Sequence, residues 1–140
     1  MQRITLWAAA VVLGLAALLA PTRPAAAQGY VVVVNAAGPA TLTKDEVSKA
    51  FLKKGSALAA VDQGKTARVR DAFSKDVLGR PASAIATYWQ QQIFAGKDVP
   101  PPEKGSDADV LAFVKGNPKA IGYVAGGAAL PDGVKAVTVQ

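Results

Sequence analysis

The chain has 140 residues, no cysteine, no histidine and a formal net charge of +6. The missing side chains exclude disulfide bonds, thiolate and Ser-His-Asp catalysis, and the usual zinc and copper sites. The positive charge mildly favours anionic ligands, but no basic run with interleaved aromatic residues indicates nucleic-acid binding. The carboxylates, lysines and tyrosines that remain form no convincing catalytic constellation. The composition therefore predicts a protein that is not an enzyme and has no metal or cofactor.

The first 27 residues have the pattern of a secretory signal peptide. An uncharged apolar run follows Arg3 and stops at Pro21, and Ala25 and Ala27 suit the two small-residue positions of a cleavage site. The alternative is a membrane anchor, but the run falls short of the roughly 20 apolar residues that a spanning helix needs. We therefore expect cleavage after Ala27, a periplasmic or secreted location, and one small domain over residues 28–140.

The mature part opens with a strand and a helix. Residues 31–34 are four consecutive valines, a pattern typical of a strand that is covered on both faces. Thr43 then stands three residues before Glu46, which is the spacing of a capping box, and Gly55 is expected to end the helix. Its apolar residues fall on one helical face: Val47, Ala50 and Phe51.

A short strand and two more helices are predicted in the middle of the chain. Residues 56–62 suit the strand, residues 66–79 a helix that ends at Gly79, and residues 81–96 a helix with Pro81 in its first turn. The apolar stripe of the first helix consists of Val69, Ala72, Phe73 and Val77. The stripe of the second consists of Ile85, Tyr88, Trp89, Gln92 and Ile93. Both are expected to pack in the core, since aromatic stripes at helical spacing are typical of a packed face.

The last third of the sequence predicts a stiff proline-rich connection over residues 97–105, then a helix and two strands. Ser106 is expected to cap the helix, and Asp107 and Asp109 to stabilise its first turn rather than to form a metal or acid–base pair. The strands fall at 119–127 and 133–139. Strands alternating with helices indicate an α/β fold with a mixed or mainly parallel sheet flanked by about four helices.

Gly64, Lys65 and Thr66 resemble the end of a nucleotide-binding loop. That loop needs a second glycine where Ala59 stands, so the spacing excludes it. A weaker oxyanion site remains. If Thr66 caps the following helix, the amides from Ala67 onward are free, and the cations beside them are Lys65, Arg68 and Arg70. The alternative interpretation is an ordinary helix start with solvated arginines.

Five segments, in this order, resemble the phosphate-type substrate-binding proteins of ABC transporters. They are VVVVN at 31–35, LTKDEVSKAFLKKG at 42–55, VDQGKTARVRDAF at 61–73, YWQQQIFAGKDVPPP at 88–102 and VKGNPKAIGYV at 114–124. The resemblance implies a single periplasmic-binding-protein-like lobe of type II over residues 28–140. It also implies phosphate or a similar oxyanion as ligand, and an ABC transporter permease or another envelope protein as partner.

The chain departs from this family at the ligand site. An arginine and a Ser-Gly-Thr sequence touch phosphate in the full-length, two-lobed relatives, whereas the matching positions here are Gln63 and residues 67–69. Two functions are therefore expected from the sequence. The first is an exported module that binds an oxyanion, with two copies paired as a homodimer to complete the site. The second is a single-lobe envelope accessory or interaction protein that has lost solute binding.

Overall fold

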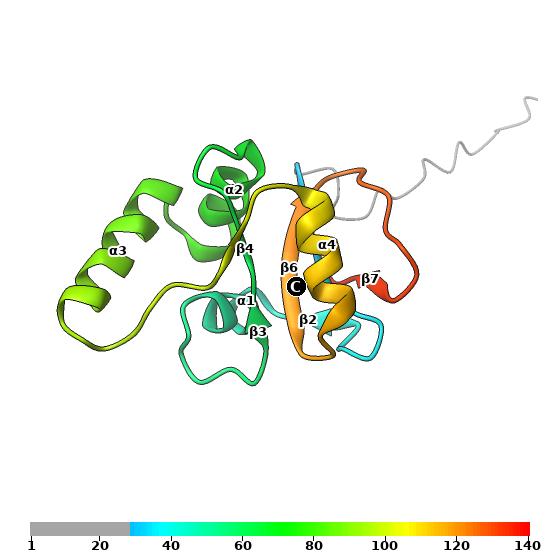
Figure 1. The fold of residues 1–140 in the computed structure, drawn as a ribbon, viewed down its shortest axis with the longest axis horizontal. Coiled ribbons are helices and arrows are strands. Elements are labelled where there is room, and N and C mark those ends of the chain that lie inside the picture. The colour runs from blue at the N-terminus through cyan, green and yellow to red at the C-terminus, as the bar shows by residue number, and fades with distance from the viewer. Residues whose placement is uncertain (1–28) are drawn as a thin grey trace, which may run out of the picture.

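A four-stranded mixed sheet lies at the centre of residues 29–140, the part of the chain that the computed structural model describes (Figure 1). The strands, in sheet order, are β3 (Ala59–Ala60), β6 (Ala120–Ala125), β1 (Tyr30–Asn35) and β7 (Val134–Ala136). β1 is antiparallel to both of its neighbours, and β3 is parallel to β6. The predicted α/β fold with a mixed sheet is confirmed. The predicted cleavage site lies outside the described residues.

β1 is covered on both faces, as its run of valines predicts. Successive side chains of a strand point to opposite faces, so Val32 and Val34 enter one apolar cluster and Val33 enters the other. Helices α1 (Lys44–Phe51) and α2 (Arg68–Phe73) contribute to the first cluster, and α4 (Asp107–Gly116) to the second. The sheet therefore separates two cores, and β1, one of its two inner strands, carries side chains into both.

Two short parallel strand pairs flank the sheet. β2 (Thr41–Leu42) pairs with β8 (Thr138–Val139), and β4 (Asp62–Gln63) pairs with β5 (Glu103–Lys104). Between β4 and β5 the chain runs away from this strand pair and returns to it. This excursion, residues 64–102, is called the helical arm below. It contains α2, the π-helical turn η2 (Ser74–Leu78) and α3 (Ala82–Phe94), which lies at the outer end of the molecule (Figure 1).

The predicted helix caps are confirmed at two of the helices. The Thr43 hydroxyl accepts from the Glu46 amide at 3.1 Å while the Glu46 carboxylate accepts from the Thr43 amide at 2.7 Å, and Ser106 caps α4. The predicted end of α1 at Gly55 is wrong. The helix stops at Phe51, because Lys53 adopts a left-handed conformation (φ 53°) and the Lys54 amide bonds back to Lys49 O at 2.9 Å.

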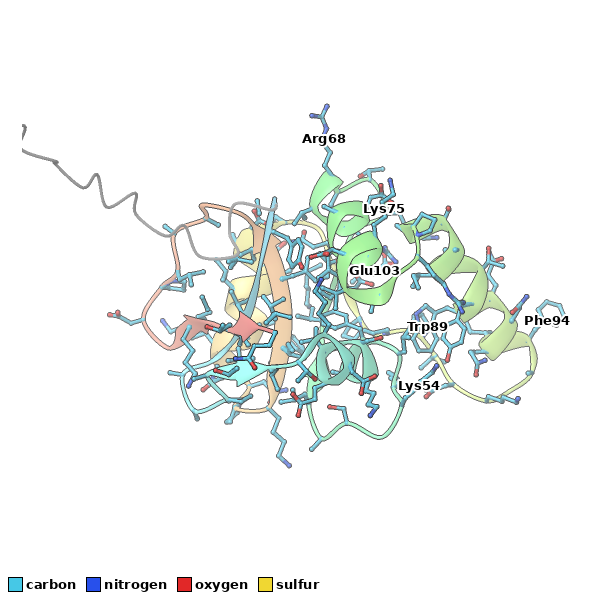
Figure 2. All side chains as sticks on the ribbon, turned by 180° about the vertical axis from the view of Figure 1, so that it is seen from behind. Lys54, Arg68, Lys75, Trp89, Phe94 and Glu103 are labelled. Atoms are coloured by element: carbon cyan, nitrogen blue, oxygen red, sulfur yellow. The ribbon has the colours of Figure 1, made fainter. Side chains whose placement is uncertain are left out.

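α3 only partly follows the predicted core stripe. Ile85 and Trp89 are buried, but Ile93 is 52% exposed, and the neighbouring Phe94 is 96% exposed. The expectation that Ile93 packs in the core is wrong because the C-terminal turn of α3 extends beyond the rest of the protein, with Phe94 at the outermost point (Figure 2). Pro81 is the N-cap of α3 rather than part of its first turn. Within residues 29–140, no helix has the length and apolar character to cross a membrane.

Asp76 in η2 joins the helical arm to β1 and α1. Its carboxylate accepts a hydrogen bond from the Tyr30 hydroxyl and forms an ion pair with the Lys44 ammonium at 3.0 Å. The hydrogen bond from Tyr30, followed by that from Lys44, lowers the pKa of Asp76. A carboxyl whose pKa is lower in the folded than in the unfolded chain stabilises the fold above the unfolded pKa, about 3.9. That stabilisation is lost as the pH falls through the folded pKa.

We therefore expect Asp76→Asn to lower the free energy of unfolding by about 1 kcal/mol at pH 7. The difference from the unmodified protein should shrink as the pH falls from about 5 towards 2, where Asp76 is protonated in both the folded and the unfolded chain. Urea unfolding at a series of pH values measures this. The matched control is Asp98→Asn, whose longer 3.7 Å contact with Lys53 is exposed and should matter less. A pH-independent loss in the Asp76 variant would show that its charge is not responsible.

Candidate functional site

The structure corrects the expected start of the helix after Gly64. α2 begins at Arg68 with Ala67 as its N-cap, and no side chain caps it. The expectation that Thr66 caps this helix is wrong, because the chain forms a tight turn in which the Ala67 amide bonds to Gly64 O at 3.0 Å. α2 is also short, six residues, before the backbone widens into η2. The feature on which the predicted oxyanion site depended is therefore absent.

The two arginines of α2 have separate environments. The Arg70 side chain is buried, and its Nη1 donates to Gln63 O and to Glu103 Oε1, each at 2.9 Å. Its Nη2 lies 3.4 Å from Asp62 Oδ2. Arg68 is exposed and points away from the molecule (Figure 2). The structure thus places one predicted site residue inside the protein and the other on its surface.

Arg70 belongs to a buried polar cluster that connects β4, β5, α2 and β6. The Tyr123 hydroxyl donates to Asp62 Oδ1, and burial followed by the Asp62 charge raises the pKa of Tyr123, so the phenol stays protonated. Burial also raises the pKa of Asp62, and the Tyr123 hydroxyl and the Arg70 guanidinium oppose this shift. Burial alone would disfavour the charge of Arg70, yet the carboxylates of Asp62 and Glu103 raise its pKa. The cluster therefore holds a charged guanidinium between two acids.

Gln63 extends this cluster to α4. Its side-chain amide donates to Asp107 Oδ1 at 2.7 Å and to Tyr123 O at 3.1 Å. Asp107 Oδ1 also accepts from the Ala125 amide at 3.3 Å. Asp107 therefore does more than stabilise the start of its helix. Among the described residues, every buried side-chain nitrogen or oxygen has a hydrogen-bond partner. The interior of the cluster accordingly needs no ligand to satisfy it.

An open cavity lies beside this cluster, between the base of the helical arm and α3. It has a volume of about 250 Å³ and is bordered by Lys65 and Arg70 on one side and by Trp89 and Gln90 on the other. A second cavity of about 210 Å³ shares Lys65 and Arg70 and extends to Ser83 in the first turn of α3. The two together are called the arm cavity below. Two cations border the arm cavity. Arg70 has carboxylate partners, whereas Lys65 has none in the described part of the chain.

The arm cavity includes groups that the sequence alone did not indicate. Ser83 and Gln90 lie on α3, and Glu103 lies on β5, all distant in sequence from Lys65. No local motif marks them, since they meet Lys65 only because the helical arm folds back. In the part of the chain that the structure covers, no group of three or more acidic side chains is arranged to hold a metal ion.

Comparisons with known proteins identify the fold. No family model and no curated protein matches the chain. A solved phosphate ABC transporter substrate-binding protein with bound phosphate, from Clostridium perfringens, is 21% identical with a TM-score of 0.61, and the match covers 79% of this chain and 44% of that one. An ABC-type phosphate transport receptor from Vibrio cholerae is 19% identical with a TM-score of 0.56, covering 79% and 46%.

A possible phosphate binding protein from Planctomyces limnophilus is also similar, with 16% identity, a TM-score of 0.53, and coverage of 80% and 41%. This chain spans less than half the length of each of these three proteins. The described residues therefore have the α/β fold of one lobe of the phosphate-type substrate-binding proteins.

Proposed function

We propose that the protein is an exported binding protein that takes phosphate or a similar oxyanion in the arm cavity. The observation that carries the proposal is the position of Lys65. Among the described residues its ammonium has no carboxylate partner, and it borders a cavity that Arg70 and Ser83 also line. The fold likeness to transport proteins for phosphate supports a binding role in general.

The start of α3 brings one further polar group to the arm cavity. The Ala82 amide at this helix end already donates to Asp71 Oδ1 at 3.1 Å, so a carboxylate occupies the end of the helix. The Ser83 hydroxyl lines the smaller cavity. An oxyanion there would meet the Ser83 hydroxyl and the Lys65 ammonium. This arrangement differs from the Lys65, Thr66, Ala67, Arg68 and Arg70 site expected from the sequence, because Thr66 does not cap and Arg68 points away.

One side of the arm cavity is open to solvent in this single lobe. The similar structures are more than twice as long as the region that this chain matches. We propose that a second copy of the chain pairs across the open side as a homodimer. Exclusion of water would strengthen each charged contact to the ligand. The expected partner for transport is an ABC transporter permease or another envelope protein.

Titration of phosphate and sulfate into the exported protein at low salt tests this function. We expect amide NMR shifts at Lys65 and Ser83, and about tenfold weaker binding after Lys65→Gln, because a charge-assisted hydrogen bond to the anion is lost. Lys119→Gln removes an equal charge from an exposed residue just before β6, which does not line the arm cavity, and should bind normally. Shifts spread evenly over the surface, or an unchanged Lys65 variant, would contradict the site. Mass spectrometry of the exported protein also tests cleavage, which should leave Gln28 first.

The second candidate function is a single-lobe envelope accessory or interaction protein that has lost solute binding. The contacts of Arg70 favour it, because Asp62 and Glu103 already neutralise this cation, the only buried one among the described residues that border the arm cavity. In this case phosphate and sulfate should produce no localised shifts. Saturable binding that depends on Lys65 would exclude this alternative.

A further inference from the structure

The net positive charge of the described residues comes from one stretch of the chain. Residues 53–98 carry eight lysines or arginines and four aspartates, an excess of +4. The other described residues carry six cationic and six anionic side chains, which cancel. This stretch contains most of the helical arm together with the turn after α1. The sheet and α4 contribute no net charge.

The aspartates of this stretch are all engaged in ion pairs, whereas many of the cations are not. The four carboxylates pair with Arg70, Lys75, Lys44 and Lys53. Five cations of the stretch have no carboxylate within 4.0 Å among the described residues: Lys54, Lys65, Arg68, Arg80 and Lys97. The free positive charge is therefore larger locally than the net value of +4 indicates.

Four of these cations lie around α3. Lys54 and Arg80 border a cavity of about 240 Å³ on one side of the helix, together with Tyr88. Lys65 borders the arm cavity on the other side, and Lys97 follows the C-terminal end of the helix. The outer end of the molecule is thus surrounded by cationic side chains that are not neutralised.

The large apolar side chains that are exposed in the described structure lie at the same end. They are Ile93 at 52%, Phe94 at 96% and Val99 at 58% exposure, and are called the apolar tip below. Figure 2 shows Phe94 directed away from the protein at the end of α3. Each residue would lose contact with water if this end met an apolar phase. The loop that follows is short and proline-rich, with Pro100, so the tip is presented on a stiff support.

We propose that the apolar tip docks on the surface of an anionic lipid bilayer. Phe94, Ile93 and Val99 would enter the boundary between headgroups and acyl chains, and the surrounding cations would contact lipid phosphates. This combination of a few apolar side chains and flanking lysines and arginines is how peripheral proteins bind membranes. The inference goes beyond oxyanion binding and does not depend on it.

Two other occupants fit the tip less well. A stable protein partner usually covers about 800 Å² on each side, and three side chains on a protruding tip offer much less apolar area. A second copy that met this tip with its own would add only three more apolar side chains, which is again much less than a stable interface covers. An anionic bilayer supplies both the opposite charge and an apolar layer that adapts to a convex tip.

Binding to lipid vesicles tests the proposal. The sample is the protein purified from a bacterium that expresses the full chain, and mass spectrometry identifies its N-terminal residue. Vesicles of phosphatidylglycerol and phosphatidylcholine are compared with vesicles of phosphatidylcholine alone, by co-sedimentation at low and high salt. We expect binding only to the anionic vesicles, weakened at high salt by screening. Phe94→Ser should weaken it about tenfold through lost apolar burial. Lys54→Gln with Lys97→Gln should weaken it by about fivefold for each charge removed.

The matched control is Lys119→Gln with Lys135→Gln, which removes the same charge from the residue before β6 and from β7. We expect it to bind like the unmodified protein. Equal weakening in this control would show an unspecific charge effect and overturn the proposal. So would unchanged binding after Phe94→Ser, or the absence of binding to anionic vesicles. Self-association that Phe94→Ser abolishes, seen by sedimentation velocity without vesicle binding, would instead identify a second copy as the occupant.

Discussion

Replacement of Arg70 by methionine is expected to lower the free energy of unfolding by about 3–5 kcal/mol. The guanidinium is the partner of the buried Asp62 carboxylate and of Glu103, and it satisfies Gln63 O. Methionine fills similar space but leaves the Asp62 carboxylate without its counter-ion and the Gln63 carbonyl without this donor. Arg70, Asp62 and Gln63 are buried, so water does not replace the lost contacts. Urea unfolding at pH 7 measures the loss of stability.

Two comparisons make this prediction specific. Arg68→Met, two residues away on the surface, should leave the stability unchanged within error. Adding Asp62→Asn to Arg70→Met should recover part of the loss, because the buried charge is removed together with its partner. If the single Arg70 variant were as stable as the unmodified protein, the buried polar cluster would not be what holds the helical arm to the sheet.

Replacement of Phe73 by alanine is expected to cost about 3–5 kcal/mol, the usual range for truncation of a buried aromatic residue. Phe73 is 1% exposed, and its ring stacks on Tyr123 with centroids 4.0 Å apart and planes 9° apart. It also meets Phe51 at 4.7 Å and Tyr30 at 5.6 Å. One side chain of α2 thus contacts α1, β1 and β6, so its removal opens a cavity where these elements join.

The same substitution at Phe94 provides the matched control. Phe94→Ala should leave the free energy of unfolding unchanged within error, because the side chain is 96% exposed. Both variants are measured by denaturant unfolding with the slope of the transition recorded, so that a change in the unfolded state is recognised. A small loss at Phe73 would mean that the surrounding aromatic rings move into the space.

Features encoded by short stretches of sequence could be predicted. The valines of β1 placed a strand with two buried faces, and the spacing of Thr43 and Glu46 placed a capped helix start. Ser106 gave the start of α4 in the same way. These patterns depend on residues a few positions apart, so the local chain determines them. The end of α1 failed because Lys53 took the left-handed position that glycine usually fills.

The candidate site could not be predicted, because it depends on contacts between distant segments. Asp62 and Tyr123 are 61 positions apart, and Arg70 and Glu103 are 33 positions apart. No local spacing indicates that these side chains meet in the interior. The sequence alone therefore did not distinguish the buried Arg70 from the exposed Arg68. Ile93 was misplaced for a related reason, since helical periodicity does not reveal where a helix extends past its neighbours.

The strand order has a consequence for how the chain folds during synthesis. β1 is the first strand of the described chain to be made, yet its two partners are β6 and β7, which are made near the end. Such long-range pairing gives a high contact order. The chain loses conformational entropy in closing the long loop before the contacts between the strands form and compensate for that loss. The central sheet cannot close until residues 120–136 have left the ribosome. A chain with the signal peptide predicted here would thus stay open for translocation throughout nearly all of its synthesis.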